Sequence, residues 1–254
     1  MPSARPWTDE YTLLCERCGY VIEGLPTEGA CPECGRPIAR SLPERRVGTP
    51  WQQDRTWRSL LSTWMATTLH PLDTLDRMRP DVPAGPLRGW CIGTGTAVVL
   101  CPYAGFLLLL ALNDPLIGKA EHGSRYALVA AASVACVALL LPGPLLLLTE
   151  IEEAGLRFIG RGRRFRITPQ SSSIICDHGS VGWLIGCVLA SFVFFPIAVL
   201  EVQPNRSLPG WVWALPLAAA LPGFLFFETF AWLGLRRLKY ANRTRPGPAG
   251  QAAP

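Results

Sequence analysis

The sequence has few charged residues and very few histidines. Only 17% of its 254 residues are charged, against about a quarter in an ordinary soluble domain, and its mean hydropathy is +0.24. Its three histidines provide no carboxylate and histidine set for a di-iron centre. This composition excludes an ordinary soluble domain and predicts an integral membrane protein.

Several catalytic and targeting motifs are also missing. We find no phosphate-binding glycine loop, no nucleophile elbow, no HExxH and no internal repeat of the inverted-repeat transporter type. The first residues, MPSARPWTDEYTLL, lack the apolar core of a secretory signal peptide. We therefore expect a non-enzymatic protein whose N-terminal region stays on the cytosolic side.

Long apolar runs are present instead. A membrane-spanning helix needs about 20 mostly apolar residues. Four windows meet this length, and only the last of them contains a charge, Glu228. The expected spans are 90–112, 126–148, 180–200 and 208–233, within a membrane domain of residues 90–240. The sequence thus predicts an all-α integral membrane bundle, with five spans or a re-entrant segment as the alternatives.

Basic residues follow an alternating pattern along the chain. They are frequent before the first span, in the second loop and after the fourth span, and scarce in the first and third loops, which hold Lys119, Arg125 and Arg206. By the positive-inside rule, both termini and the middle loop face the cytoplasm. Topology and attraction to anionic headgroups account for the net charge of +5, so we expect a bilayer and no nucleic acid as the partner.

Four cysteines form two tight pairs in residues 1–40, a segment that we call the cysteine module. The spacing is Cys15-x2-Cys18-x12-Cys31-x2-Cys34, and a glycine follows the second cysteine of each pair. Because the cytosol keeps thiols reduced, this pattern predicts metal ligation rather than disulfides. Four thiolates make a closed tetrahedral site, which suits structural zinc and leaves no position for a substrate.

This segment resembles a known family. CGYVIEG followed by CPECG is similar to zinc-ribbon and rubredoxin-type knuckles, and to the module at the head of many uncharacterised bacterial membrane proteins. The ribbon resemblance implies zinc, β-knuckles and a structural role, whereas the rubredoxin resemblance implies iron and electron transfer. We favour zinc because the chain offers no second redox centre, with iron as the alternative.

The region between this module and the first span divides in two. Residues 41–50 (SLPERRVGTP) are expected to be a linker, and residues 51–89 an amphipathic helical segment that Pro71 interrupts. Apolar residues recur there at helical spacing: Trp57, Leu60, Leu61, Trp64, Met65, Thr68 and Leu69. Basic residues on the other side favour a helix lying in the headgroup plane, and packing on the membrane bundle is the alternative.

The membrane part resembles the Yip1-like domain. The resemblance rests on a helix ending in His70-Pro71, a short LxxL continuation and spans rich in glycine and proline. The Yip1-like domain usually has five spans, whereas we count four here. The resemblance implies action by association with membranes and partners rather than by substrate turnover.

A few polar residues have side chains that are capable of proton transfer or cation binding. Glu228 lies in the fourth span, and Asp177 and His178 immediately precede the third. Together they would form a polar cluster at the cytoplasmic edge, serving either as a proton or cation site or only in packing. Cys176 and His178 provide two ligands, which are too few for a metal site. Cys91, Cys101, Cys136 and Cys187 are expected to pack inside the spans.

Three functions remain. The first is a membrane protein whose zinc ribbon binds a cytoplasmic protein partner or serves in assembly. The second is a small transporter or channel that uses Glu228, and the third is a membrane-bound electron carrier with a rubredoxin-like iron. Residues 241–254 are expected to be disordered, and the sequence does not define the oligomeric state.

Overall fold

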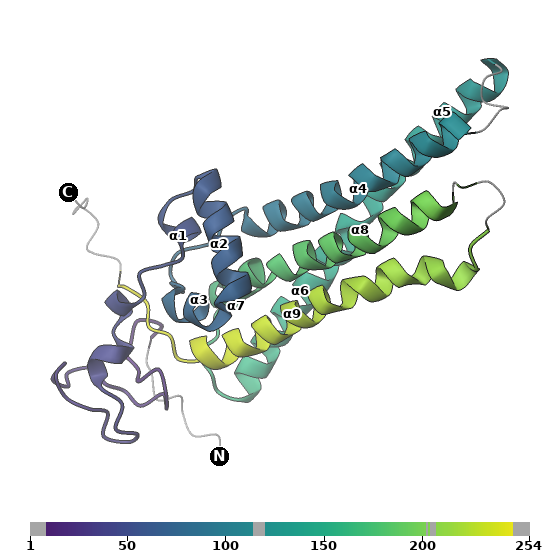
Figure 1. The fold of residues 1–254 in the computed structure, drawn as a ribbon. Coiled ribbons are helices and arrows are strands. Elements are labelled where there is room, and N and C mark those ends of the chain that lie inside the picture. The colour runs from purple at the N-terminus through teal and green to yellow at the C-terminus, as the bar shows by residue number, and fades with distance from the viewer. Residues whose placement is uncertain (1–8, 114–119, 202, 204–206, 246–254) are drawn as a thin grey trace. The chain divides into compact units, whose positions relative to one another are not determined.

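A computed structural model describes residues 9–113, 120–201, 203 and 207–245 (Figure 1). Within this part of the chain there are helices but no β-strand. The α-helices are α1 (Pro50–Gln53), α2 (Trp57–Leu69), α3 (Pro71–Arg77), α4 (Leu87–Asn113), α5 (Ala120–Leu140), α6 (Pro142–Gly162), α7 (Pro169–Gly179), α8 (Val181–Glu201) and α9 (Leu215–Leu238). The 3-10 helices are η1 (Ile38–Ser41), η2 (Pro43–Arg45) and η3 (Gly210–Ala214). The expected helical class is confirmed.

Four helical stretches are long and apolar enough to cross a membrane, as the sequence predicts. They are Leu87–Leu112, Ala127–Gly162, Pro169–Glu201 and Gly210–Leu238. The second combines α5 with α6, the third α7 with α8, and the fourth η3 with α9. A proline lies inside each of α4, α8 and α9, and Pro142 begins α6 where α5 ends.

The second stretch is longer than the apolar run that identified it. The expected span ended at residue 148, but α6 continues to Gly162 through a segment that contains glutamates and arginines. Leu156 in this extension is buried and Phe158 is exposed. The extension is helical because one of its faces packs, so apolar content alone could not predict its end.

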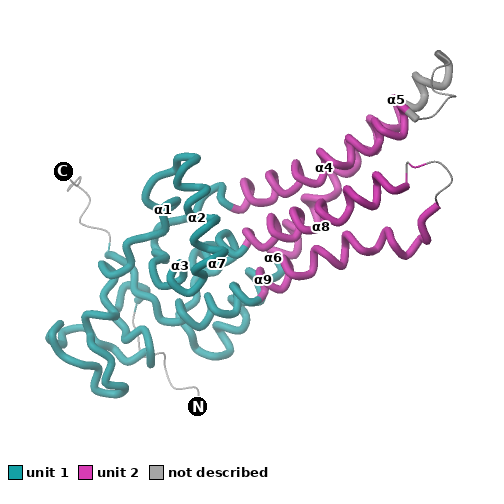
Figure 2. The backbone as a smooth tube through the Cα atoms, in the orientation of Figure 1, with its two compact units in different colours: residues 1–87, 151–179, 229–254 teal, residues 88–150, 180–228 magenta. Residues whose placement is uncertain are grey.

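The chain folds into two compact units (Figure 2). Unit 1 comprises residues 1–87, 151–179 and 229–254, and unit 2 comprises residues 88–150 and 180–228. The expected order of ribbon, linker, helical segment and membrane domain differs from this division. Unit 1 joins the cysteine module to the ends of the four apolar stretches, namely Leu87, residues 151–162, α7 and residues 229–238.

In unit 2, glycines bring helix backbones into close contact. A Cβ at Gly223 of α9 would lie 2.4 Å from the Gly182 carbonyl oxygen and 2.3 Å from the Gly186 nitrogen of α8. A Cβ at Gly95 of α4 would lie 3.0 Å from the Cys187 Sγ of α8. Since any side chain would separate these backbones, small residues define the packing of α4, α8 and α9.

Trp183 forms the aromatic centre of unit 2. Its ring stacks on Phe227 with centroids 4.6 Å apart, and both residues are buried with Ile92. Its indole Nε1 donates to the Thr149 Oγ1 of α6 at 2.9 Å. This hydrogen bond satisfies the one polar atom of the indole within an apolar core.

In unit 1, α2 packs through its polar face. Ser59, Thr63 and Thr67 are buried together with Leu60, and the Trp51 backbone N–H donates to Thr63 Oγ1 at 2.9 Å. The opposite face is apolar and exposed, with Trp57 67%, Met65 63% and Leu69 63% accessible. We call this surface the α2 stripe, which consists of Trp57, Leu61, Met65 and Leu69. Arg58, which was expected on an opposite basic face, lies with its guanidinium over the Trp57 ring.

Residues 41–50 are packed rather than free. Ser41, Arg46 and Thr49 are buried, and the segment contains η2, the end of η1 and the capping box of α1. The expected linker is therefore an ordered part of unit 1, held by polar side chains that bond to other segments.

Candidate metal centre

The two cysteine pairs adopt the same turn. The Gly19 N–H donates to the Cys15 carbonyl oxygen at 2.8 Å, and the Gly35 N–H donates to the Cys31 carbonyl oxygen at 2.9 Å. Both glycines have positive φ, +84° and +70°, a conformation that glycine adopts without a steric penalty. Only the isolated bridges Leu14–Val21 and Ala30–Pro37 accompany the turns. The expected β-knuckles are thus turns without strands in the described residues.

The four thiols converge on one point. Their sulfur atoms all lie within 4.8 Å of one another, with Cys15–Cys34 at 3.5 Å and Cys18–Cys31 at 3.6 Å. Tetrahedral zinc with sulfur bonds of about 2.3 Å separates its ligand atoms by about 3.8 Å. A disulfide needs only about 2.05 Å, and all four cysteines are free. The donor set therefore fits a metal ion and no disulfide.

The turns shift the acidity of the thiols. Burial alone would raise the pKa of Cys15, but the backbone N–H groups of Cys18 and Arg17 donate to its sulfur, and together with neighbouring thiols they lower the pKa to about 7. Burial raises the pKa of Cys18 and of Cys34. Metal binding deprotonates all four thiols, so a bound ion would replace the hydrogen bonds that they share here.

Arg46 connects the first turn to two helix ends. Its guanidinium donates to Glu16, between Cys15 and Cys18, from Nε to Oε1 at 2.8 Å and from Nη2 to Oε2 at 3.1 Å. It also donates to the Leu75 carbonyl oxygen of α3 at 2.9 Å and to the Arg237 carbonyl oxygen of α9 at 3.3 Å. These helix C-termini have orphan carbonyls and partial negative charge, which a buried cation satisfies.

Arg166 and Asn242 form a second connection. The Asn242 amide accepts from the Leu14 N–H at 2.9 Å and donates to the Leu14 carbonyl oxygen at 2.7 Å. Arg166 donates to the Thr12 carbonyl oxygen at 2.6 Å and to Asn242 Oδ1 at 2.7 Å. Burial lowers the pKa of Arg166 to about 10, with Arg243 adding to this, so the group stays charged at neutral pH. The turn is thus bonded to residues after α9.

This network corrects the expected disordered tail. Ala241, Asn242 and Arg243 are buried, so the beginning of the predicted tail 241–254 is part of the fold. Polar composition suggested disorder, but here the polar groups bond to the cysteine module. Residues 246–254 lie outside the described residues.

The two turn glycines provide a matched prediction. Gly19→Ala is expected to destabilise unit 1 more than Gly35→Ala does. Positive φ penalises both alanines by about 1–2 kcal/mol. A Cβ at Gly19 would also lie 2.8 Å from the Tyr240 ring, whereas one at Gly35 has nothing within 4 Å. Thermal unfolding of the two variants tests this, and equal losses would contradict the contact with Tyr240.

The predicted polar residue His178 is held by hydrogen bonds within the fold. His178 is fully buried, and its Nδ1 lies 2.9 Å from the Ile174 carbonyl oxygen. Because a carbonyl only accepts, Nδ1 carries the proton and Nε2 accepts from Thr49 Oγ1 at 3.0 Å. Both ring nitrogens are engaged, which leaves none for a metal in the Cys176 and His178 pair.

The predicted polar cluster is divided between the units. Asp177 and His178 belong to unit 1, and Glu228 belongs to unit 2, where it is half-buried. Ser173 Oγ donates to Asp177 Oδ2 at 3.4 Å within α7. The cluster therefore stays a prediction.

Sequence reasoning missed Glu16, Arg46, Arg166 and Asn242 as parts of the site. Arg46 and Arg166 were counted only in the basic excess, and the Arg237 carbonyl that Arg46 contacts lies 191 residues away. A short-range signal existed only for Glu16, as a charge inside a metal turn.

We compared the chain with known proteins and found no match. No protein family, no curated protein and no solved structure matches the chain.

Proposed function

We propose that the chain is a non-enzymatic, multi-pass membrane protein in which a zinc-bound cysteine module holds together the cytoplasmic ends of the membrane helices. The observation that carries the proposal is the contact of Glu16, between two ligand cysteines, with Arg46, which bonds to the ends of α3 and α9. Such a protein acts by association with lipid and partners rather than by turnover.

Zinc is the ion that we propose. Four thiolates leave no open coordination position, which is typical of a structural zinc site. The resemblance of CGY and CPECG to zinc ribbons points the same way. The module is too short to form a core of its own, and a structural zinc ion supplies on the order of 10 kcal/mol of folding free energy.

Metal analysis of the purified full chain tests this assignment. We expect zinc in a ratio of one to the chain and a colourless protein. Iron at that ratio, with the visible absorption of ferric thiolate, would replace the proposal by the electron-carrier alternative. A metal-free protein with oxidised cysteines would reject both.

The module also offers a surface for a protein partner. Its first turn faces Tyr240 and Asn242, whereas Glu23, Thr27, Glu28 and Pro32, outside that turn, are exposed. Two of these four residues are acidic, so we propose that a basic cytoplasmic partner binds this surface.

The α2 stripe supports contact with the bilayer surface. Its apolar side chains are exposed while the polar face of the helix is buried. An Arg58 guanidinium over Trp57 combines a cation with an aromatic ring, a pair suited to the headgroup region. Unit 1 contains the ends of the candidate spans, so its surface includes the membrane boundary.

A spin label tests the position of the stripe. In a background with Cys101 and Cys136 replaced by alanine, Met65→Cys carrying a nitroxide is expected to collide more with oxygen than with an aqueous nickel chelate. Ala39→Cys, at an exposed position of the cysteine module, is the matched control and should prefer nickel. Equal aqueous access at both positions would reject the interfacial location.

The orientation rests on the charge pattern. Arg17, Arg36, Arg46, Arg236, Arg237 and Lys239 line a cavity of about 200 Å³ in unit 1, together with Glu16 and Asp76. This excess of cations is suited to a membrane surface with anionic lipids. We therefore propose that unit 1 and both termini face the cytoplasm.

The transporter alternative has weaker support. Glu228 is half-buried in α9, and it does not line the apolar cavity of unit 2. If Glu228→Gln abolished ion flux in proteoliposomes at unchanged expression, this alternative would replace the proposal.

A further inference from the structure

The second apolar stretch packs differently from the other three. Glycines join α8 and α9 of unit 2 backbone to backbone, and Gly95 of α4 packs against the Cys187 side chain of α8. In contrast, no residue in the most apolar window of Ala127–Gly162 is buried, whereas 33% of the corresponding window of Pro169–Glu201 and 11% of each of the other two windows is buried. Its bonds to the rest of unit 2 include Thr149 with Trp183 and Glu150 with Arg88, both near one end. Half-buried positions such as Leu141 and Leu145 recur along the stretch, so one of its faces lies against the other helices while no residue of its apolar window is enclosed.

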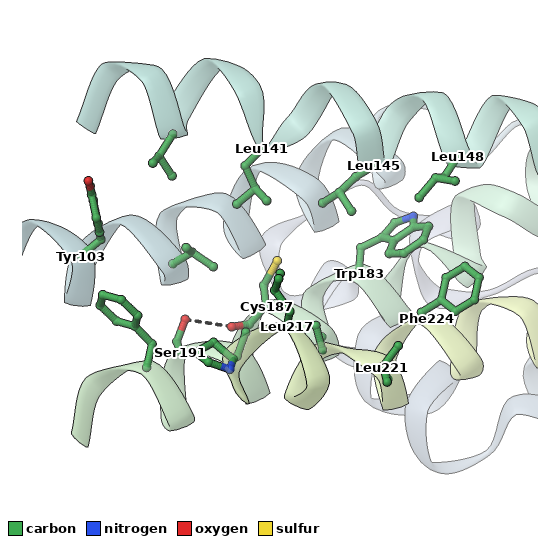
Figure 3. Close-up of a pocket in the computed structure, with 17 residues that line it drawn as sticks. Tyr103, Leu141, Leu145, Leu148, Trp183, Cys187, Ser191, Leu217, Leu221 and Phe224 are labelled. Carbon is green, nitrogen blue, oxygen red and sulfur yellow. Dashed lines mark hydrogen bonds between the residues drawn. The ribbon is translucent and has the colours of Figure 1, made fainter. Parts of the chain in front are cut away.

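A cavity of about 450 Å³ lies beside this stretch (Figure 3). Leu141, Leu145 and Leu148 form one side, and residues of α4, α8 and α9 form the other. The cavity is elongated, with Tyr103 at one end and Phe224 at the other.

Two polar side chains at the wall, Ser191 and Trp183, have partners within the protein. Ser191 Oγ lies 2.8 Å from the Cys187 carbonyl oxygen and 3.1 Å from the Val98 carbonyl oxygen, to which its hydroxyl donates. The Trp183 Nε1 proton is bonded to Thr149. A ligand is therefore recognised by apolar contact, with its polar part outside this wall.

The cavity opens to the surface of unit 2. Leu217 and Leu221 line it, yet 76% and 56% of their surfaces are accessible. In a chain with four candidate spans, an exposed leucine surface of this kind faces lipid. Hydrocarbon chains thus reach the cavity from the bilayer.

Size and chemistry select the occupant. Interiors are packed without large voids, and a cavity without polar partners does not hold water well. A slender chain fits the elongated space.

We propose that this cavity binds the hydrocarbon chain of a membrane lipid, either acyl or isoprenoid, with the headgroup outside. Its lining residues belong to unit 2 and include none of the residues of the candidate metal centre. Its specificity comes from the width of the gap between the second stretch and the glycine-packed helices.

Photolabelling of the full chain in nanodiscs tests the proposal. One probe is a phospholipid with a diazirine in the middle of its acyl chain, and the other is an isoprenoid phosphate with a diazirine in its chain. We expect labelling of Leu141 and Leu145 to saturate at a low probe fraction. Labelling of Phe192, which is exposed and outside the cavity, should rise in proportion to the probe. The probe that saturates first identifies the chain type.

Two phenylalanine variants complete the test. Ala190 lines the cavity, whereas Ala104 is exposed on α4 and does not. Ala190→Phe should reduce saturable labelling about tenfold or more, the discrimination that an apolar pocket shows for small changes in fit, and Ala104→Phe should leave it unchanged. The wild-type titration decides the matter even if Ala190→Phe does not fold. Proportional labelling at Leu141 and Phe192, or a peptide crosslinked in the cavity, would overturn the proposal.

Discussion

Replacing Cys31 and Cys34 together with serine is expected to abolish metal binding and to unfold the cysteine module. The two substitutions remove half of the ligands from a site whose sulfur atoms lie within 4.8 Å of one another. Because bound zinc supplies on the order of 10 kcal/mol in modules of this size, the apolar contacts among Cys15, Ile22 and Ile38 are too few to replace it. The metal content should fall from one per chain to none, and residues 23–36 should become sensitive to protease.

The chain provides a matched control for this experiment. Cys101 and Cys136 are exposed thiols in the membrane helices, and their double replacement by serine should change neither metal content nor protease sensitivity. If the Cys31 and Cys34 double variant kept its metal and its protection, the four cysteines would not be the ligands.

The second large effect is expected for Arg46→Met. The side chains of Arg46 and Glu16 are 2% and 4% accessible, and removing one partner of a buried ion pair costs about 3–5 kcal/mol. The substitution leaves the Glu16 carboxylate and the carbonyls of Leu75 and Arg237 without their donor. The unfolding temperature of unit 1 should fall while the purified variant still binds metal, because the four thiols are unchanged.

Two variants identify the source of that effect. Arg45→Met removes the adjacent, exposed arginine, which donates to the Arg40 carbonyl oxygen, and should cost less than about 1 kcal/mol, as exposed polar contacts do. The double variant Glu16→Gln, Arg46→Met should lose less stability than the sum of the losses in the two single variants. Each single variant leaves one unpaired buried charge, whereas the double variant leaves none. Strict additivity would contradict a direct coupling between the metal turn and the helix ends.

Local patterns predicted much of this protein. The length of apolar runs identifies the four candidate spans, because a helix in lipid must satisfy its own backbone and be apolar outside. The spacing of Cys15, Cys18, Cys31 and Cys34 predicts their convergence, since two short turns suffice to orient four thiols. Pro71 marks the boundary between α2 and α3 because proline fits the first position of a helix.

Other features depend on contacts that no local pattern contains. The α2 stripe was expected as one face of an amphipathic helix, but the buried residues are Ser59, Thr63 and Thr67 together with a single leucine, Leu60. Small hydroxyl side chains pack closely and bond to backbone, and only the tertiary partner decides that they lie inside. Likewise, Asn242 follows a membrane helix at the start of a polar stretch of sequence, yet its amide bonds to Leu14, 228 residues away.

Hydrogen exchange at the end of α9 tests most directly whether the cysteine module holds the ends of the membrane helices in place. We expect removal of the metal by a chelator to accelerate exchange both in residues 12–22 and in residues 236–243, because Arg46, Arg166 and Asn242 join the two segments. Faster exchange in residues 12–22 with unchanged exchange in residues 236–243 would contradict the account.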